Sequence, residues 1–477
     1  MILFIYLVHR FNRIFRRWER SHNSTITHTP HHSTVSGMWL MPEIGLLTSS
    51  IEYGIVSRSL PFTGKILRGY LDASGTGLGI GNPNAEFTPN VSTCALSSDG
   101  GTAKIIWGFR TGEVALMSAN RAMDHGRAAA KLTRCKVDDE HEGAVQDAIW
   151  CASNHFVTGA LDGRVKLWDA KRVKCIWASD IKEGSLVPDP CIKVASLASK
   201  GIVVGAMKSG DIVVWTGLQA IFAEDAPQLV QPFIPEIRIS SPVRAATEPA
   251  SRENGSAHDI MVICLDHSAL SKHLILVAYT NSPYFHRLCL DVHSNSVESV
   301  PFGEEPLGSI TAIKPSFGNR EGETSFVIVG NQLGCISIYD WSASPSCGSL
   351  KLLSVCASRK FEAHEDGSVT AIAYDSTTLV SGSSRGTIKI WDSLTFAPLR
   401  SFSSPGVRPP SGGEWDGVAH IILEKDLLIV SVGIRVMAWK AGPVANRGQA
   451  TWKGKYVKKS KKNGAAKGYR EQLSFYS

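Results

Sequence analysis

Short runs of alternating apolar and polar residues, separated by glycine-containing turns, recur along most of this chain of 477 residues. The clearest run, residues 157–169, reads VTGALDGRVKLWD. Asp162-Gly163 between two apolar runs predicts a tight hairpin turn, because both turn residues need positive φ. After the turn, Val165 and Leu167 alternate with charged residues, which is typical of a strand with one buried face. The run therefore predicts a strand, a turn and a second strand.

The same pattern repeats along the chain. Aligning each copy on the residue that ends its third element, usually an aromatic, gives eight units, which end near residues 59, 107, 168, 215, 290, 339, 391 and 439. A regular spacing of this kind, 48 residues from 391 to 439 for example, predicts a repeat architecture whose units bury their faces on one another. Eight units are favoured; seven remain if the first or the fifth, the least regular copies, is discounted.

The two strongest copies end in Trp168-Asp169 and Trp391-Asp392, and the pattern resembles the WD-repeat family over residues 37–440. The resemblance implies an all-β propeller in which each repeat forms one four-stranded blade. It also implies that a loop His, a strand Ser or Thr, a turn Asp and a strand Trp hold each blade together. One repeat has all four of these residues, namely His141, Thr158, Asp162 and Trp168.

A second repeat has three of the four, namely His364, Ser381 and Trp391. Arg385 stands where the family pattern has Asp. The resemblance therefore implies that this blade is held less tightly and that Arg385 points to solvent.

Residues 1–36 are predicted to form an amphipathic helix followed by a flexible linker. Apolar residues in the first part recur at steps of three and one, which places them on one helical face, and the candidate docking residues among them are Phe4, Leu7, Phe11, Ile14, Phe15 and Trp18. Residues 7–14 also resemble the end of an F-box, the module that docks substrate receptors onto cullin-type ubiquitin ligases, as in fungal proteins that join an F-box to a propeller. An F-box remnant, an ordinary docking or packing helix and a membrane-surface helix all stay open.

The linker histidines His22, His28, His31 and His32 lie in a Ser/Thr/Pro-rich stretch without the ordered spacing of a metal site.

Charge is concentrated at the two ends. Residues 1–20 carry five arginines and one glutamate, residues 453–470 carry eight Lys or Arg and no acid, and the whole chain has a net charge of +7. The middle of the chain is therefore mildly acidic, which argues against nucleic-acid binding by the propeller. Residues 441–477 form a basic tail, which suits a nuclear import signal, weak nucleic-acid contact or a solvated tail equally well.

Sequence motifs give no support for catalysis. Gly382-Ser383-Ser384-Arg385-Gly386 satisfies GxSxG, but it falls between two predicted strands, whereas a hydrolase places its nucleophile at a strand-to-helix turn. We therefore expect no enzyme activity, no catalytic residues, no cofactor and no metal. The first eight residues are apolar, too few to span a bilayer, and no other stretch approaches that length, so no integral membrane segment is expected.

The predicted function is a scaffold that binds other proteins through the propeller faces, in the cytoplasm, the nucleus or both. The F-box likeness adds a finer expectation, a substrate receptor of a cullin-type ubiquitin ligase with an F-box-binding adaptor as partner. Two alternatives stay open. A basic pocket within the blades would favour a phosphoinositide- or RNA-binding propeller, and a cluster of carboxylates or histidines on one face would favour a propeller enzyme.

Overall fold

The protein is described by a computed structural model with two compact units, one of residues 24–440 and one of residues 1–23 with 441–477. The described residues are 8, 18, 26–31, 33–41, 45–66, 70–74, 90–119, 130–180, 188–222, 234–242, 259–269, 272–291, 294, 296–318, 323–345, 354–403, 416–424 and 426–441. Val8 and Trp18 are helical. Within the described residues no helix is long and apolar enough to cross a membrane.

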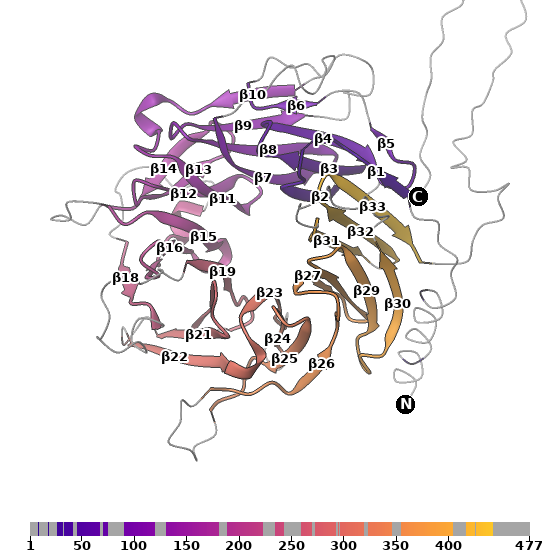
Figure 1. The fold of residues 1–477 in the computed structure, drawn as a ribbon. Helices are drawn as coiled ribbons and strands as arrows, with labels where there is room; N and C mark the ends of the chain where they lie inside the picture. The colour runs from indigo at the N-terminus through magenta and orange to yellow at the C-terminus, as the bar shows by residue number, and fades with distance from the viewer. Residues whose placement is uncertain are drawn as a thin grey trace, which may run out of the picture. The chain divides into compact units, whose positions relative to one another are not determined.

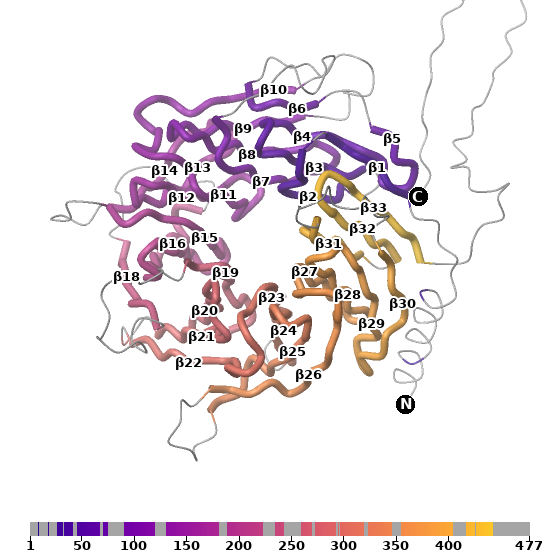
Figure 2. Tube along the Cα trace, viewed as in Figure 1, coloured from indigo at the N-terminus to yellow at the C-terminus, as the bar shows by residue number. Residues whose placement is uncertain are grey.

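The unit 24–440 is a ring of eight antiparallel sheets, called blades 1 to 8 in chain order (Figure 1). This confirms the predicted all-β propeller with eight blades. The tube in Figure 2 shows that the first strand of each blade lies toward the centre of the ring and the fourth toward the outside. First strands contact each other between all neighbouring blades except 5 and 6, including β2 of blade 1 with β31 of blade 8. Blades 5 and 6 share one apolar cluster instead, so the ring is closed.

The strands of the first four blades follow in chain order, each blade starting with its inner strand. Blade 1 contains β2 (Gly37–Met41), β3 (Gly45–Ser50), β4 (Ile55–Leu60), β5 (Lys65–Ile66) and β6 (Leu71–Asp72). Blade 2 contains β7 (Val91–Asp99), β8 (Thr102–Phe109), β9 (Val114–Ala119) and β10 (Ala130–Arg134). Blade 3 contains β11 (Val145–Ala152), β12 (His155–Ala160), β13 (Val165–Asp169) and β14 (Lys174–Ala178). Blade 4 contains β15 (Cys191–Leu197), β16 (Ile202–Met207), β17 (Ile212–Trp215) and β18 (Glu236–Ile239).

The other four blades repeat this arrangement. Blade 5 contains β19 (Ile260–Leu265), β20 (His273–Tyr279), β21 (Tyr284–Asp291) and β22 (Ser296–Gly303). Blade 6 contains β23 (Ile310–Ser316), β24 (Phe326–Asn331), β25 (Cys335–Asp340) and β26 (Arg359–Glu362). Blade 7 contains β27 (Val369–Tyr374), β28 (Thr378–Ser383), β29 (Thr387–Asp392) and β30 (Pro398–Ser403). Blade 8 contains β31 (Val418–Glu424), β32 (Leu427–Val432), β33 (Arg435–Lys440) and β1 (Ile26–His28). The connections between strands contain the short helices η2 (Val137–Asp139), η3 (Ala198–Lys200), α2 (Gln219–Phe222) and η4 (Glu305–Leu307).

Strand β1 closes the ring, since it supplies the outer strand of blade 8 from the beginning of the chain. Ile26 pairs with Ala438 and His28 with Val436 of β33. The propeller boundary at residue 37 is therefore corrected, because a strand of the propeller lies within the segment predicted to be a flexible linker. His28 Nε2 lies 2.9 Å from Ser59 Oγ, and His31 is buried with its Nδ1 2.9 Å from the Ser33 carbonyl oxygen, so these two linker histidines belong to the packed structure.

Seven of the eight predicted unit ends lie in the third strand of a blade, as expected. The predicted end of the second unit was wrong. Trp107 lies in β8, the second strand of blade 2, and the third strand is β9. The turn glycine of this blade is Gly112, with φ 93°, in the place that Gly163, with φ 78°, occupies in blade 3. Gly101, which the alignment used instead, lies in the turn between the first two strands. Two glycine turns in succession therefore shifted the predicted register by one strand.

Blades pack closely because small residues in the second strands admit the next blade. A Cβ added at Gly159 would lie 2.6 Å from Cys191 Sγ at the start of the next inner strand. A Cβ added at Gly382 would lie 2.4 Å from the Cβ of Val418 in the same way. In blades 2 to 8 the pairing between the inner strand and the second strand shifts register directly after the first residue of the inner strand. Such an irregularity bends the strand at the position where it meets its neighbour.

Candidate functional site

A chain of hydrogen bonds ties the loop before blade 3 to the body of that blade. Trp168 Nε1 of β13 donates to Thr158 Oγ1 of β12 at 2.8 Å. Thr158 Oγ1 lies 2.8 Å from Nε2 of His141, which precedes β11. All three side chains are buried, and the Trp168 ring stacks on Phe156 with centroids 5.8 Å apart. Because Thr158 accepts from Trp168, its own hydroxyl hydrogen is available to His141 Nε2, which then acts as acceptor.

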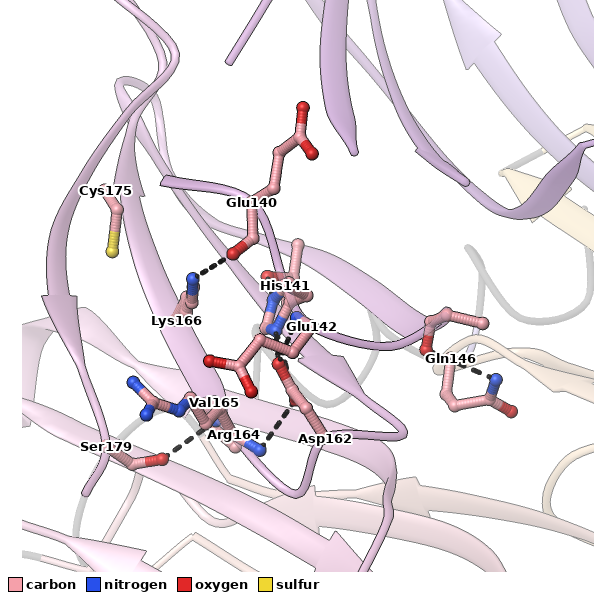
Figure 3. Close-up of polar contacts among 12 residues, drawn as sticks. Glu140, His141, Glu142, Gln146, Asp162, Arg164, Val165, Lys166, Cys175 and Ser179 are labelled. Atoms are coloured by element: carbon pink, nitrogen blue, oxygen red, sulfur yellow. Dashed lines mark hydrogen bonds and ion pairs between the residues drawn. The ribbon is translucent and has the colours of Figure 1, made fainter. Parts of the chain in front are cut away.

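Asp162 completes this network at the turn between β12 and β13 (Figure 3). Its carboxylate lies 3.0 Å from His141 Nδ1 and accepts from the backbone N–H groups of Glu142 at 3.0 Å and Arg164 at 2.9 Å. Burial acts to raise the pKa of Asp162, but His141 and the two amides outweigh it, so the pKa lies below its ordinary value. Burial lowers the pKa of His141 against the opposing effect of Asp162, so the neutral ring is favoured. The structure thus brings together all four predicted residues of this repeat.

The corresponding network of blade 7 uses a different acid. Trp391 Nε1 donates to Ser381 Oγ at 2.9 Å, and Ser381 Oγ lies 2.9 Å from His364 Nε2. Arg385 is exposed to solvent, as the resemblance implied. The nearby acid is Asp366, whose Oδ1 is 3.6 Å from His364 Nδ1, too far for a hydrogen bond.

Asp366 was missed by the sequence reasoning. Its Oδ2 accepts from Thr387 Oγ1 at 2.6 Å and from Ser383 Oγ at 3.1 Å, so hydroxyl groups of the turn between β28 and β29 hold it. In blade 3, Asp162 lies within the equivalent turn itself. The available signal was an acid two residues after His364 with hydroxyl residues on both sides of the turn. His364 Nδ1 is buried and has no hydrogen-bond partner among the described residues, and burial lowers the pKa of His364 to about 4.

Most of the exposed large apolar side chains in the loops and turns of the described propeller lie on the face that carries these networks, spread over blades 3, 6 and 8. We call it the network face, formed by the loops between blades and the turns between second and third strands. Its exposed large apolar side chains are Val137, Leu161, Leu333 and Ile434, exposed by 80%, 42%, 55% and 37%. The opposite face, formed by the other two sets of turns, has Leu394 at 61%. Leu161 directly precedes Asp162, and Val137 lies four residues before His141 in the loop that enters blade 3.

The other predicted site residues are placed less fully. Of the candidate docking residues, Trp18 is helical and buried, while Phe4, Leu7, Phe11, Ile14 and Phe15 lie outside the described residues, as does the basic tail beyond residue 441. The GxSxG sequence forms the turn between β28 and β29, where the Ser384 amide donates to the Ser368 carbonyl at 2.9 Å. In the described part of the chain, no three His, Cys, Asp or Glu residues are grouped to hold a metal ion.

Comparisons with known proteins agree with this geometry. Residues 133–169 and 356–392, the segments that hold the two networks, each match the family model of the WD domain, G-beta repeat. Among solved structures, the computationally designed Ika8 protein is similar with a TM-score of 0.53 and 17% identity, over 87% of this chain and 98% of that one. Saccharomyces cerevisiae Sqt1 is similar with a TM-score of 0.56 and 14% identity, over 88% of this chain and 99% of that one. At these identities the likenesses show the fold alone. No curated protein sequence matches the chain.

Equivalent turn positions in the two networks allow a matched test of stability. We expect Asp162→Ala to lower the free energy of unfolding by about 2–4 kcal/mol, because it leaves His141 and two amides without their acceptor. Arg385→Ala, at the equivalent turn position, should change it by less than about 0.5 kcal/mol because Arg385 is exposed. Urea unfolding at neutral pH measures both. Equal losses in the two variants would contradict the assigned roles.

The blade 7 network should also make stability depend on pH. The folded-state pKa of His364, about 4, lies below its ordinary value of 6.5, so the unfolded chain binds the proton more readily. The contribution of neutral His364 to the free energy of unfolding is complete above pH 6.5. It is lost as pH falls toward 4, and the loss is at most about 3 kcal/mol. We expect His364→Gln to flatten the fall in unfolding free energy between pH 7 and pH 5, while Arg385→Ala keeps the wild-type slope. An unchanged slope in His364→Gln would exclude this histidine as a source.

Proposed function

From two WD-repeat segments set in an eight-bladed propeller, we propose that this chain is a non-enzymatic scaffold that binds other proteins through its network face. The observation that carries the proposal is the presence of apolar side chains exposed on rigid loops of that face. Single exposed apolar residues are common on soluble proteins, so their number matters less than how they are held. The strongest case is the pair beside the blade 3 network.

The loop that carries Val137 is fixed in place. Lys166 Nζ, on a side chain that is largely buried, donates to the main-chain carbonyls of Asp139 at 3.0 Å and Glu140 at 2.7 Å (Figure 3). A loop held in one conformation loses little entropy when a partner binds, which favours affinity. Val137 therefore presents its apolar side chain at small entropic cost.

Leu161 adjoins the same loop. A Cβ added at Gly143 would lie 3.1 Å from the Leu161 Cβ, which shows how closely the turn and the loop approach each other. The loop of residues 136–144 carries four carboxylates, those of Asp138, Asp139, Glu140 and Glu142, against one lysine, Lys136. Apolar side chains on a loop of net negative charge suit a protein segment that carries apolar and basic side chains, and the charge mainly sets specificity and association rate.

A finer proposal concerns the start of the chain. If the likeness of residues 7–14 to the end of an F-box reflects function, residues 1–20 dock an F-box-binding adaptor while the network face holds a substrate for ubiquitin transfer. The amphipathic spacing of apolar residues over residues 1–20 supports a docking helix. The propeller then acts as the substrate receptor of a cullin-type ligase.

The face assignment is tested with paired surface variants. We expect Val137→Asp/Leu161→Asp to lose partners that crosslink to the wild-type protein in cells, because a charged side chain replaces each apolar contact that the partner would bury. Leu394→Asp, at a leucine on the opposite face whose exposure of 61% lies between those of Leu161 and Val137, should retain them. Quantitative mass spectrometry of crosslinked complexes gives the comparison. Identical partner sets for both variants would rule out the network face at blade 3.

The ligase proposal needs a truncation that spares the propeller. Deleting residues 1–23 leaves β1 intact, whereas deletion to residue 36 would remove the strand that completes blade 8. We expect the full chain to co-purify with an F-box-binding adaptor and the 24–477 chain to lose it, with both keeping the same thermal unfolding midpoint. Failure of the intact chain to recover any such adaptor would refute the ligase role and leave the scaffold role standing.

A further inference from the structure

A small cavity of about 190 Å³ lies between blades 2 and 3 toward the face opposite the networks. Its lining residues are Lys104, Leu116, Ser118, Lys131, Thr133, Asn154, Ala170 and Lys171. Three lysines, two hydroxyls and one amide thus surround a space with no carboxylate among its lining residues. Such a composition is unexpected in a propeller whose sequence is mildly acidic between its basic ends.

The pairing of blade 2 explains why two of these lysines lie in one row. Ser118 of β9 is paired directly with Lys104 of β8 on one side and with Lys131 of β10 on the other. Directly paired residues project from the same face of a sheet, and adjacent strands lie about 4.8 Å apart. The two lysines therefore flank Ser118 in a single row across three strands.

Blade 3 supplies the opposite wall. Leu116, two residues before Ser118 and so on the same face of β9, packs against a cluster that contains Trp168 and Ala170 of blade 3. The lysine row consequently lies at the rim of the interface between the two blades. Lys171 and Asn154 reach it from two turns of blade 3.

Lysines in one row across a sheet repel one another, and an anion between them relieves that repulsion. Lys104 Nζ donates to Asp99 Oδ2 at 3.1 Å and to the Ser153 carbonyl at 3.2 Å. An ammonium has three N–H donors, so one remains for the cavity. The Asp99 side chain is 69% exposed, and Asp99 is not part of the cavity lining, so it screens only part of the positive charge.

We propose that this cavity binds the phosphoryl group of a phosphate monoester. Lysine ammonium groups bind phosphate as point charges, and the Ser118 and Thr133 hydroxyls can donate to further oxygens. A second cavity of about 310 Å³ shares Lys104 and is lined by the hydroxyl residues Ser97, Ser98 and Ser153, by Trp150, Cys151 and Ala152, and by Asp99, the carboxylate that already pairs with Lys104. It offers space for the remainder of the ligand, either a soluble phosphorylated molecule or a lipid headgroup.

Calorimetry and thermal unfolding of the full chain test the site, with inorganic phosphate and inositol trisphosphate as probes and chloride at matched ionic strength as reference. We expect both probes to bind and to raise the unfolding midpoint, because a ligand that binds only the folded state stabilises it. Lys131→Gln should weaken binding roughly tenfold, since it removes one charge-assisted contact. Lys208→Gln, an exposed lysine on the network face, should bind as the wild type does.

Lys131 is exposed, so the variant should fold, and an unchanged unfolding midpoint in chloride verifies this. Flotation with phosphatidylcholine vesicles, with and without phosphatidylinositol phosphate, then separates the two sources. Binding of inositol trisphosphate without flotation supports the site with a soluble ligand, and lysine-dependent flotation supports it with a lipid headgroup. Absence of binding by both soluble probes, or equal weakening by Lys208→Gln, would overturn the proposal.

Discussion

Closure of the ring is the constraint on which the rest of the structure depends. Each blade buries its faces on its neighbours, so a blade at an open end would expose apolar side chains and strand edges. The contact of β2 with β31 and the pairing of β1 with β33 remove that open end. Gly159 and Gly382 show the same requirement on a smaller scale, because a side chain at either position would hold two blades apart.

The rigidity of the ring allows short turns to act as fixed positions for binding. In blade 3, Asp162 joins a loop, a turn and, through His141, the interior tryptophan, so the outer loop is continuous with the core. Blade 7 keeps the interior part of this network but holds its acid through hydroxyl groups of the turn. The two faces then differ in chemistry: apolar and acidic side chains border the blade 3 network, and a lysine row lies at the opposite end of the interface between blades 2 and 3.

Periodicity revealed the number of blades because the turn between the second and third strands holds a glycine with positive φ in every blade but the fifth, where Asn281 takes its place, and such glycines leave a signal in the sequence. It failed in blade 2, where Gly101 and Gly112 each lie in a turn and Trp107 mimicked the aromatic of a third strand. It missed β1 because three residues are too short to show alternation. The four-residue network around Trp168 could be named from the family pattern. The role of Asp366 as the acid of the blade 7 network could be recognised only from the folded geometry. The lysine row could not be found either, since Lys104, Ser118 and Lys131 become neighbours only through strand register.

Strand β1 also has a consequence for biosynthesis. Its partner, β33, is the last strand of the propeller to leave the ribosome, so Ile26–His28 stays unpaired while all the intervening blades emerge. During that interval the nascent chain has two uncovered ends, one at each side of the growing arc, and these are the surfaces on which partly folded chains associate. A chain that stops before β33 would keep both ends uncovered permanently. Premature termination should therefore yield an aggregating product rather than a shorter working scaffold.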